Sequence, residues 1–574
     1  MMLTTIFHPA KLIIHKLASR LFLRKSFCQF PDPLVLPVCY NAPQYGNKVA
    51  IYDQTGSYSF RNLFIEAQML SSKLSILLGG STGERVLFLC PNDASYVITI
   101  WAIWMAGQIA VPLSPLHPEQ LLEYYIKDAN SRLMVSSLEF AKTLHSLSRK
   151  SGIQQHLLEE DLLLRAKTHK SVDPNPDPLS KEFYQSSDAL ILYTSGTTGN
   201  PKGVVLTHRN INVQLKMHIE AWKWSASDMI LHTLPLHHVH GTLYALFCPL
   251  FVGASIIMLP KFNAALAWSY LLNRKQEVEG KVSVFMAVPT IFSKLIEEFD
   301  LNLSSSSELV KEFLSSHMRL MVSGSAPLPE PVFERWLAIS GYKLLERYGM
   351  TEIGMALTND YDSDREPGFV GMPLPSVSVA LADPDTKEIV FKCANQSGKF
   401  LVENTAQDQD QDPTGELLVK GESVFREYFN KPQETLKEFT EQGWFITGDI
   451  AQYSIEKRNF KMLGRKSADI IKSGGYKISA LQIETLLLAH PGIKECTVLG
   501  VPDQTYGERV AAVLVFNKEP PESLAALKEW CGGKMPKYWV PTVWKVVENI
   551  PKNALGKVNK RELRNQLFNK SLES

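Results

Sequence analysis

The sequence predicts an α/β protein with a large N-terminal domain of parallel and mixed sheets covered by helices, and a small α+β C-terminal domain. Short apolar runs such as 133–135, 282–286 and 320–322 alternate with segments whose apolar residues recur at helical spacing, for example 121–126. This alternation is typical of parallel strands joined by helices. The chain also has 574 residues, whereas one hydrophobic core stops growing at about 250–300 residues. At least two domains are therefore expected.

The longest uncharged stretch, 96–116, has the length of a membrane-spanning helix, which needs about 20 residues. Glycine and proline interrupt this stretch, so we expect a buried helix followed by a strand at 109–111. A second apolar run, 243–259, is broken in the same way by Pro249 and Gly253. No transmembrane segment is predicted.

The pattern changes after Gly464, where short strands and two helices form a compact unit. Ser479 and Gln482 have the spacing of a helix-capping box, and strands are expected at 496–501 and 510–516. We predict that residues 465–574 form the small C-terminal domain.

The N-terminal segment differs from the rest of the chain. No acidic residue precedes Asp32, and basic residues are spaced among apolar ones so that a helix would have one basic and one apolar face. This pattern predicts a mitochondrial transit peptide at 1–30 and delivery to the matrix. The alternative is an amphipathic helix that lies on a surface. The large domain would then span 31–464.

The charge balance and the cysteines exclude several classes of protein. Lys and Arg total 60 and Asp and Glu total 59, so no overall field attracts nucleic acid. The seven cysteines form no Cys-x-x-Cys pair, which disfavours a disulfide framework or a zinc site. Nothing in the composition indicates an obligate protein partner.

A loop suited to phosphate follows the apolar run 189–192. Glycine lets backbone N–H groups converge, hydroxyl side chains add donors, and lysine adds a positive charge. The order differs from a Walker loop, because Lys202 stands between Pro201 and Gly203. The predicted phosphate-binding residues are Thr194, Ser195, Gly196, Thr197, Thr198, Gly199, Asn200, Pro201 and Lys202.

This loop and four later segments, in the same order, resemble the adenylate-forming superfamily of acyl-CoA synthetases, adenylation domains and luciferases. The later segments are 346–352, 443–449, 464–477 and 551–557. The resemblance implies that ATP and Mg²⁺ activate a carboxylate as an acyl-AMP, and that the thiol of coenzyme A then displaces AMP. Activation is needed because a free carboxylate is a poor acylating agent.

The resemblance also implies a role for individual residues. Thr351 would hold the α-phosphate and Glu352 would bind magnesium. Tyr348 would flank the adenine, with Ser325 in the segment on its other side. Asp449 suits the two ribose hydroxyls, because one carboxylate accepts both hydrogen bonds, and Arg465 would reach the ribose or a phosphate.

The resemblance further implies that the C-terminal domain is mobile. Lys557 would be the catalytic lysine that bridges the carboxylate and the α-phosphate during adenylation. Rotation about a hinge at Ser467 would then replace Lys557 by the loop that contains Gly474 and Gly475, which would line the passage for coenzyme A.

Two residues indicate which acid is activated. Arg319 begins an apolar strand with no evident partner, and a substrate with a second carboxylate would pair with it. His238 would donate a hydrogen bond in the acyl pocket. The segments around both residues resemble malonyl-CoA synthetases, so malonate is the expected acid and methylmalonate a further candidate. Arg319 could instead pair with a protein acid.

Two other functions stay open at this point. A medium-chain fatty acyl-CoA ligase would need an apolar tunnel in place of Arg319. A non-catalytic nucleotide-binding homologue is disfavoured, because Lys557, Glu352 and Asp449 are all present.

Overall fold

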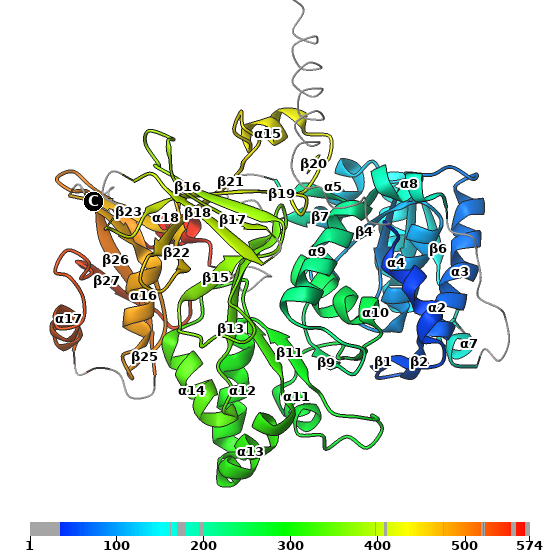
Figure 1. Cartoon of the computed structure of the whole chain (residues 1–574), viewed down its shortest axis with the longest axis horizontal. Coiled ribbons are helices and arrows are strands. Elements are labelled where there is room, and N and C mark those ends of the chain that lie inside the picture. Colours follow the sequence, from blue (N-terminus) through cyan, green and yellow to red (C-terminus); the bar gives the residue numbers. More distant parts are fainter. Residues whose placement is uncertain are drawn as a thin grey trace, which may run out of the picture.

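Figure 1 shows the computed structural model, which describes residues 35–160, 162–168, 179–194, 200–396, 398–406, 410–474, 476–517, 521, 523–552 and 558–568. The predicted transit peptide lies outside these residues. The expected α/β architecture is confirmed, since two large sheets with covering helices precede a smaller third sheet.

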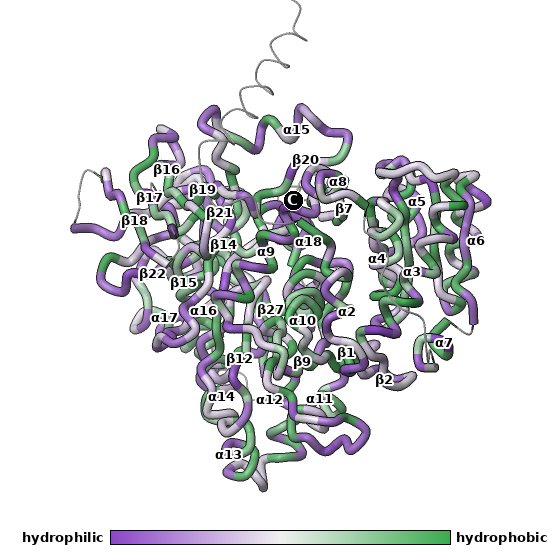
Figure 2. Tube along the Cα trace, turned by 45° about the vertical axis from the view of Figure 1, so that its right-hand side comes forward, coloured by the Kyte–Doolittle hydropathy of each residue, from purple (hydrophilic) through white to green (hydrophobic). Residues whose placement is uncertain are grey.

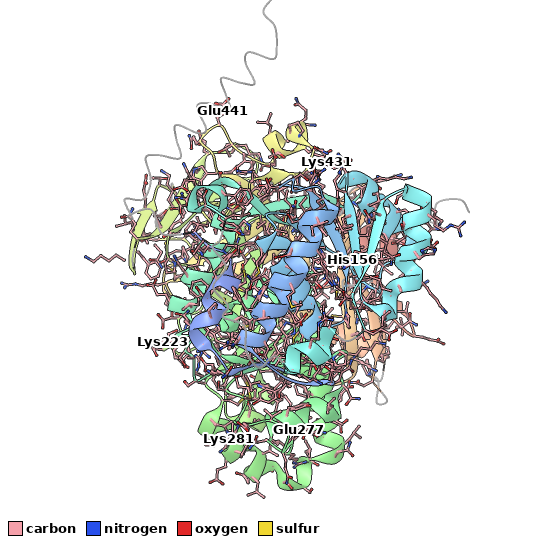
Figure 3. The ribbon with its side chains drawn as sticks, turned by 90° about the vertical axis from the view of Figure 1, so that its right-hand side faces the viewer. His156, Lys223, Glu277, Lys281, Lys431 and Glu441 are labelled. Atoms are coloured by element: carbon pink, nitrogen blue, oxygen red, sulfur yellow. The ribbon has the colours of Figure 1, made fainter. Side chains whose placement is uncertain are left out.

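The seven-stranded sheet has the order β20-β8-β7-β4-β3-β5-β6. Its centre is parallel, and the last two strands towards β20 are antiparallel. The strands are β3 (Arg85–Leu89), β4 (Ile109–Pro112), β5 (Leu133–Ser136), β6 (Gln154–Leu157), β7 (Asp188–Thr194), β8 (Lys202–Thr207) and β20 (Glu427–Tyr428). In the side view of Figure 3, His156 marks β6 at the outer edge of this sheet.

The uncharged stretch 96–116 folds as predicted into a buried helix and a strand. Helix α4 (Ala94–Met105) is capped by Asp93 and ends before Gly107, which has a φ of 70°, and β4 follows. The second apolar run divides into the π-helical segment η4 (His240–Phe247), α10 (Cys248–Val252) and β10 (Ser255–Met258). Among the described residues, no helix is long and apolar enough to cross a membrane.

The fifteen-stranded sheet is parallel at its centre and antiparallel along one arm and at the opposite edge, where β2 (Gly56–Ser59) pairs with β1. The parallel strands are β1 (Val49–Asp53), β10, β9 (Met229–His232), β11 (Val284–Ala287), β12 (Leu320–Ser323) and β13 (Leu345–Met350). The predicted strands at 282–286 and 320–322 are thereby confirmed. Helices α11 (Ala264–Leu271), α12 (Pro289–Asn302), α13 (Ser307–His317) and α14 (Glu330–Ser340) form the lower lobe in Figure 1.

The antiparallel arm continues this sheet from β13 to its edge at β18. The strands are β14 (Gly354–Thr358), β15 (Phe369–Pro373), β22 (Asn459–Arg465), β21 (Phe445–Ser454), β19 (Thr414–Gly421), β16 (Val377–Ala382), β17 (Ile389–Gln396) and β18 (Lys399–Asn404). The main core lies between the two large sheets and buries Trp101, Trp104 and Phe247.

The C-terminal unit has its own five-stranded sheet and its own core. Its elements are β23 (Ile470–Ser473), β24 (Tyr476–Ser479), α16 (Ala480–Leu488), β25 (Ile493–Asp503), β26 (Gly507–Phe516), α17 (Leu524–Gly532), β27 (Val543–Val546) and α18 (Lys560–Phe568). As expected from its spacing, Ser479 caps α16 by accepting a hydrogen bond from the Gln482 N–H at 3.2 Å.

Candidate active site

A cavity of about 2130 Å³ lies where both large sheets and the C-terminal unit meet. Pockets for one drug-sized ligand are typically about 300–1,000 Å³. The space is therefore large enough for a nucleotide together with other substrates. Its wall contains segments from four of the five regions that carried the resemblance, and the fifth region, 551–557, directly precedes the lining residues 558–561.

The two residues that flank the central part of the predicted phosphate loop lie in the cavity wall. Strands β7 and β8 are antiparallel neighbours, and Thr194 and Lys202 line the cavity from their facing ends. The Lys202 Nζ lies 3.2 Å from Glu438 Oε1 and 4.4 Å from the centre of the Tyr428 ring. Asn200 is exposed, and the Pro201 carbonyl accepts a hydrogen bond from Tyr124. Residues 195–199 lie outside the described residues.

Glu352 is buried, with 5% of its surface exposed, and it contacts Tyr428, the residue whose ring lies beside Lys202. Its Oε1 accepts a 2.9 Å hydrogen bond from the Tyr428 hydroxyl. Burial raises the pKa of Glu352, the Tyr428 hydrogen bond opposes that shift, and the nearby Glu438 raises the pKa further. Two neighbouring carboxylates in a cavity wall are a donor set that a divalent cation would stabilise. Thr351 also lines the cavity.

The predicted nucleoside residues meet around one carboxylate. Asp449 on β21 lies opposite Arg465 on β22, and Arg465 Nε is 2.8 Å from Asp449 Oδ1. The hydroxyl of Tyr348 donates to Asp449 Oδ2 at 2.5 Å. Ser325 lines the same cavity in a left-handed backbone conformation, with a φ of 69°. The fold therefore brings together four residues separated by up to 140 positions in the sequence.

Arg319 is not part of this cavity, and the expectation that it lacks a protein partner is wrong. Its Nε and Nη2 donate to the two carboxylate oxygens of Asp228 at 2.5 and 2.6 Å. Its Nη1 donates to the carbonyl of Trp222 at 2.8 Å, and the rings of Trp224 and Tyr361 lie beside the guanidinium. Asp228 precedes β9 and stands 91 positions before Arg319. The arginine therefore completes a buried structural ion pair.

A different arginine, Arg347 on β13, lines the cavity and is buried, with 6% of its surface exposed. Its Nη2 donates to Ser325 Oγ at 3.1 Å, and its Nε has no hydrogen-bond partner among the described residues. Gly324 packs directly against this guanidinium, since a Cβ at position 324 would lie 2.5 Å from the guanidinium carbon and would displace the arginine side chain.

Arg347 stays positively charged in this environment. Burial lowers its pKa to about 10, which is still well above neutral pH. It makes no ion pair with any residue that the structure describes. An unpaired buried cation is costly, so this wall of the cavity favours an anionic ligand. The sequence alone indicated no role for Arg347.

Histidines form the adjoining wall. His237, His238 and His240 line the cavity, and His240 Nδ1 lies 3.4 Å from Ser325 Oγ. Burial holds the pKa of His240 well below its usual value, and the charge of Arg347 lowers it further. His240 is therefore a neutral ring at physiological pH. The predicted substrate residue His238 is at the cavity, beside His237, with ring centres 4.1 Å apart.

The C-terminal unit closes the cavity with the start of α18. Val558, Asn559 and Lys560 line it, whereas the predicted catalytic Lys557 lies outside the described residues. The Lys560 Nζ lies between Asp469 Oδ1 at 2.5 Å and Glu484 Oε1 at 2.7 Å. The predicted hinge residue Ser467 lines the cavity, Gly474 does not, and Gly475 lies outside the described residues.

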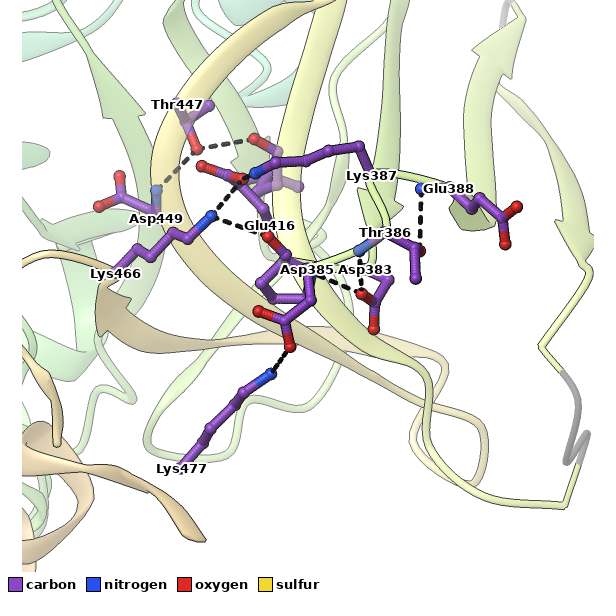
Figure 4. Close-up of polar contacts among 12 residues, drawn as sticks. Asp383, Asp385, Thr386, Lys387, Glu388, Glu416, Thr447, Asp449, Lys466 and Lys477 are labelled. Atoms are coloured by element: carbon purple, nitrogen blue, oxygen red, sulfur yellow. Dashed lines mark hydrogen bonds and ion pairs between the residues drawn. The ribbon is translucent and has the colours of Figure 1, made fainter. Parts of the chain in front are cut away.

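Ion pairs hold the C-terminal unit in this orientation (Figure 4). Lys466, next to Ser467, is 3.1 Å from the buried Glu416 of β19. Lys477 on β24 is 2.6 Å from Asp385 in the turn between β16 and β17. Neither contact was predicted, because each joins residues 50 or more positions apart in the sequence.

Comparison with known proteins identifies the family of this chain. The AMP-binding enzyme family model matches residues 40–429, and the AMP-binding enzyme C-terminal domain model matches residues 482–557. The mouse protein "Malonate--CoA ligase ACSF3, mitochondrial" is 43% identical over 93% of this chain and 91% of its own length. A malonate–CoA ligase of Arabidopsis thaliana is 38% identical over 86% of this chain and 79% of its own length.

Two solved structures are similar to this chain in fold and sequence. The crystal structure of ATP-bound MatB from Rhodopseudomonas palustris has a TM-score of 0.77 and 31% identity, covering 92% of this chain and 98% of that one. A malonyl-CoA ligase with methylmalonyl-CoA and AMP bound has a TM-score of 0.61 and 29% identity, covering 90% and 100%. The chain belongs to the family of AMP-binding enzymes.

Proposed function

We propose that this chain is an ATP-dependent ligase that joins malonate to coenzyme A through malonyl-AMP, releasing AMP and diphosphate. The observation that carries the choice of acid is the buried charge of Arg347 in the cavity wall, which has no ion-pair partner among the described residues. The identity of 43% to a mouse malonate–CoA ligase over most of both chains supports the same conclusion.

Arg347 takes over the role first expected of Arg319. A distal carboxylate would complete a charge-assisted pair with Arg347 and accept further hydrogen bonds from Ser325 and the neutral His240. A monocarboxylic acid would leave the arginine unpaired. His238, in the same wall, remains a candidate for a second contact with the acid, and methylmalonate remains a second candidate acid.

The first step is attack of the reacting carboxylate on the α-phosphorus of ATP, with diphosphate leaving. Lys202 would neutralise negative charge on the leaving phosphates, and the loop that begins at Thr194 would donate hydrogen bonds to them. Thr351 would hold the α-phosphate. Asp449 would accept from the ribose hydroxyls and Tyr348 would flank the adenine. Glu352 would hold Mg²⁺, which supplies positive charge to the phosphates. The neighbouring Glu438 provides a second carboxylate, and two carboxylates suit a divalent cation.

The second step is attack of the thiol of coenzyme A on the acyl carbon, which breaks the bond to AMP. We propose that Lys557 acts only in the first step and that the C-terminal domain, residues 465–574, then rotates about Ser467. After this rotation, the loop with Gly474 and Gly475 would stand at the active site in place of Lys557. This rotation requires the contacts of Lys466 and Lys477 with the large domain to break.

The proposed location is the mitochondrial matrix, with residues 1–30 as the transit peptide and 31–464 as the adenylate-forming domain. The acid-free, basic pattern before Asp32 supports this proposal. The vertebrate relatives named as mitochondrial point the same way.

A panel of acids tests the function directly. AMP release that depends on both ATP and coenzyme A should be fastest with malonate, slower with methylmalonate, and slow with acetate, butyrate and octanoate. Preference for octanoate would establish the medium-chain ligase instead. No AMP release with any acid, despite ATP binding, would establish a non-catalytic homologue.

A further inference from the structure

The last strand of the fifteen-stranded sheet, β18, presents an unusual free edge. Among the described residues it pairs only with β17, and its consecutive residues Phe400, Leu401 and Val402 are 46%, 54% and 49% exposed. Figure 2 shows β17 and β18 at the margin of the molecule. Exposed apolar residues on an unpaired edge strand are a template for pairing with another strand.

The hydrogen-bonding groups of this edge face outward at alternate residues. The N–H of Thr405 donates to the carbonyl of Val390 on β17 at 2.9 Å. Because backbone direction alternates along an antiparallel strand, Lys399, Leu401 and Glu403 also direct their N–H and C=O groups towards β17. Phe400 and Val402 therefore direct theirs away from the sheet.

The sequence of this edge is complementary to itself. If a second copy of β18 lies antiparallel with Leu401 opposite Leu401, Phe400 lies opposite Val402 of the second copy. These two residues carry the outward-facing groups and can exchange both backbone hydrogen bonds. In the same register Lys399 lies opposite Glu403 of the second copy, so opposite charges face each other twice.

We propose that two copies of this protein form a two-fold symmetric dimer by antiparallel pairing of their β18 strands. Such an interface uses the same surface on both copies, so it closes at two and does not propagate. No residue of β18 lines the active-site cavity, so pairing leaves that cavity open.

The dimer should be weak and dependent on concentration. A single strand of six residues provides only a small contact, and interfaces below about 1,200 Å² of total area are typically transient. A dissociation constant in the micromolar range is therefore expected.

Charge reversal at the edge tests the proposal. Lys399→Glu and Glu403→Lys each place like charges opposite one another twice, which should weaken the dimer about tenfold or more. An equimolar mixture of the two variants places acidic edges opposite basic edges and should restore dimers, all of them mixed. The double variant restores both opposite-charge pairs and should dimerise like the original chain.

Sedimentation velocity over a concentration series measures these masses, and Lys392→Met is the matched control. Lys392 pairs with Glu403 within one chain at 3.1 Å but lies on β17, away from the free edge. It should leave dimerisation unchanged, and ligase activity should be unchanged in every variant.

Val402→Pro should also yield a monomer, because proline removes an outward-facing N–H that β17 does not use. A chain that stays monomeric at all concentrations would overturn the proposal. Dimers that persist in each single variant, or single variants whose mixture stays monomeric, would overturn it too.

Discussion

Replacing Arg319 by leucine should destabilise the protein and leave its acid selectivity unchanged. The substitution strands Asp228, whose side chain is 2% exposed, without the two short hydrogen bonds that neutralise it. Breaking a buried pair from one side costs about 3–5 kcal/mol. Arg319 itself is 23% exposed, so water can reach part of the space that it leaves. We therefore expect a loss at the lower end, about 3 kcal/mol.

The pH dependence of this loss follows from Asp228. Burial raises the pKa of Asp228, but the hydrogen bonds and charge of Arg319, with those of Ser225 and Ser283, outweigh it and leave the pKa below its usual value. Its stabilising contribution is present above the unfolded-state pKa and is lost as pH falls through the lower folded-state pKa. In Arg319→Leu burial acts without the arginine, so the difference in stability from the original chain should shrink as pH falls from 7 towards 4.

The assay is thermal unfolding at several pH values, together with kcat/KM for malonate and butyrate. The midpoint should fall by several degrees in Arg319→Leu at pH 7 while the ratio of the two kcat/KM values holds. Asp228→Asn combined with Arg319→Leu should recover part of the midpoint, because the buried charge is gone. An unchanged midpoint of thermal unfolding with a selective loss of malonate activity would refute the structural role of Arg319. It would indicate instead that Arg319 binds the substrate.

Three further variants test the proposed steps and location. Lys557→Ala should abolish formation of malonyl-AMP and spare thioester formation from supplied malonyl-AMP, measured as separate half-reactions; equal loss of both would end that division of roles. Asp385→Asn breaks an ion pair between exposed groups, which water and salt screen, so it should speed thioester formation by at most a few-fold in stopped-flow single turnovers; slower turnover would mean that the pair helps the second step. Removal of residues 1–30 should keep ligase activity and leave the protein in the cytosol of cells, by fractionation; mitochondrial delivery of the shortened chain would contradict the transit peptide.

Local patterns predicted several of the strands and a part of the cavity wall. The apolar runs at 282–286 and 320–322 became β11 and β12, because a strand buried on both faces leaves a continuous apolar signal. Tyr348, Asp449 and Arg465 were found because the motifs that contain them are short and contiguous. That Tyr348 and Arg465 both contact the Asp449 carboxylate could be known only from the fold.

Contacts between residues that are distant in the sequence could not be predicted from local patterns. Nothing near Arg319 indicates Asp228, since their pairing depends on β9 and β12 both flanking β11. Arg347 lies within one of the recognised motifs, but only its burial, with no carboxylate partner among the described residues, distinguishes it from a surface cation. The exposed edge of β18 was not predicted, because the strand is short and because its position at the end of the sheet follows only from the order of the strands in the antiparallel arm.

The most direct test of malonate ligation is the selectivity of Arg347→Met. Loss of a buried charged pair costs about 3–5 kcal/mol, more than roughly a hundredfold in rate. The variant should lose at least that factor in kcat/KM for malonate, while butyrate activity holds or rises and the dissociation constant for ATP and the unfolding midpoint stay unchanged. A parallel fall in malonate and butyrate activity, with ATP binding intact, would contradict the claim that Arg347 reads the second carboxylate.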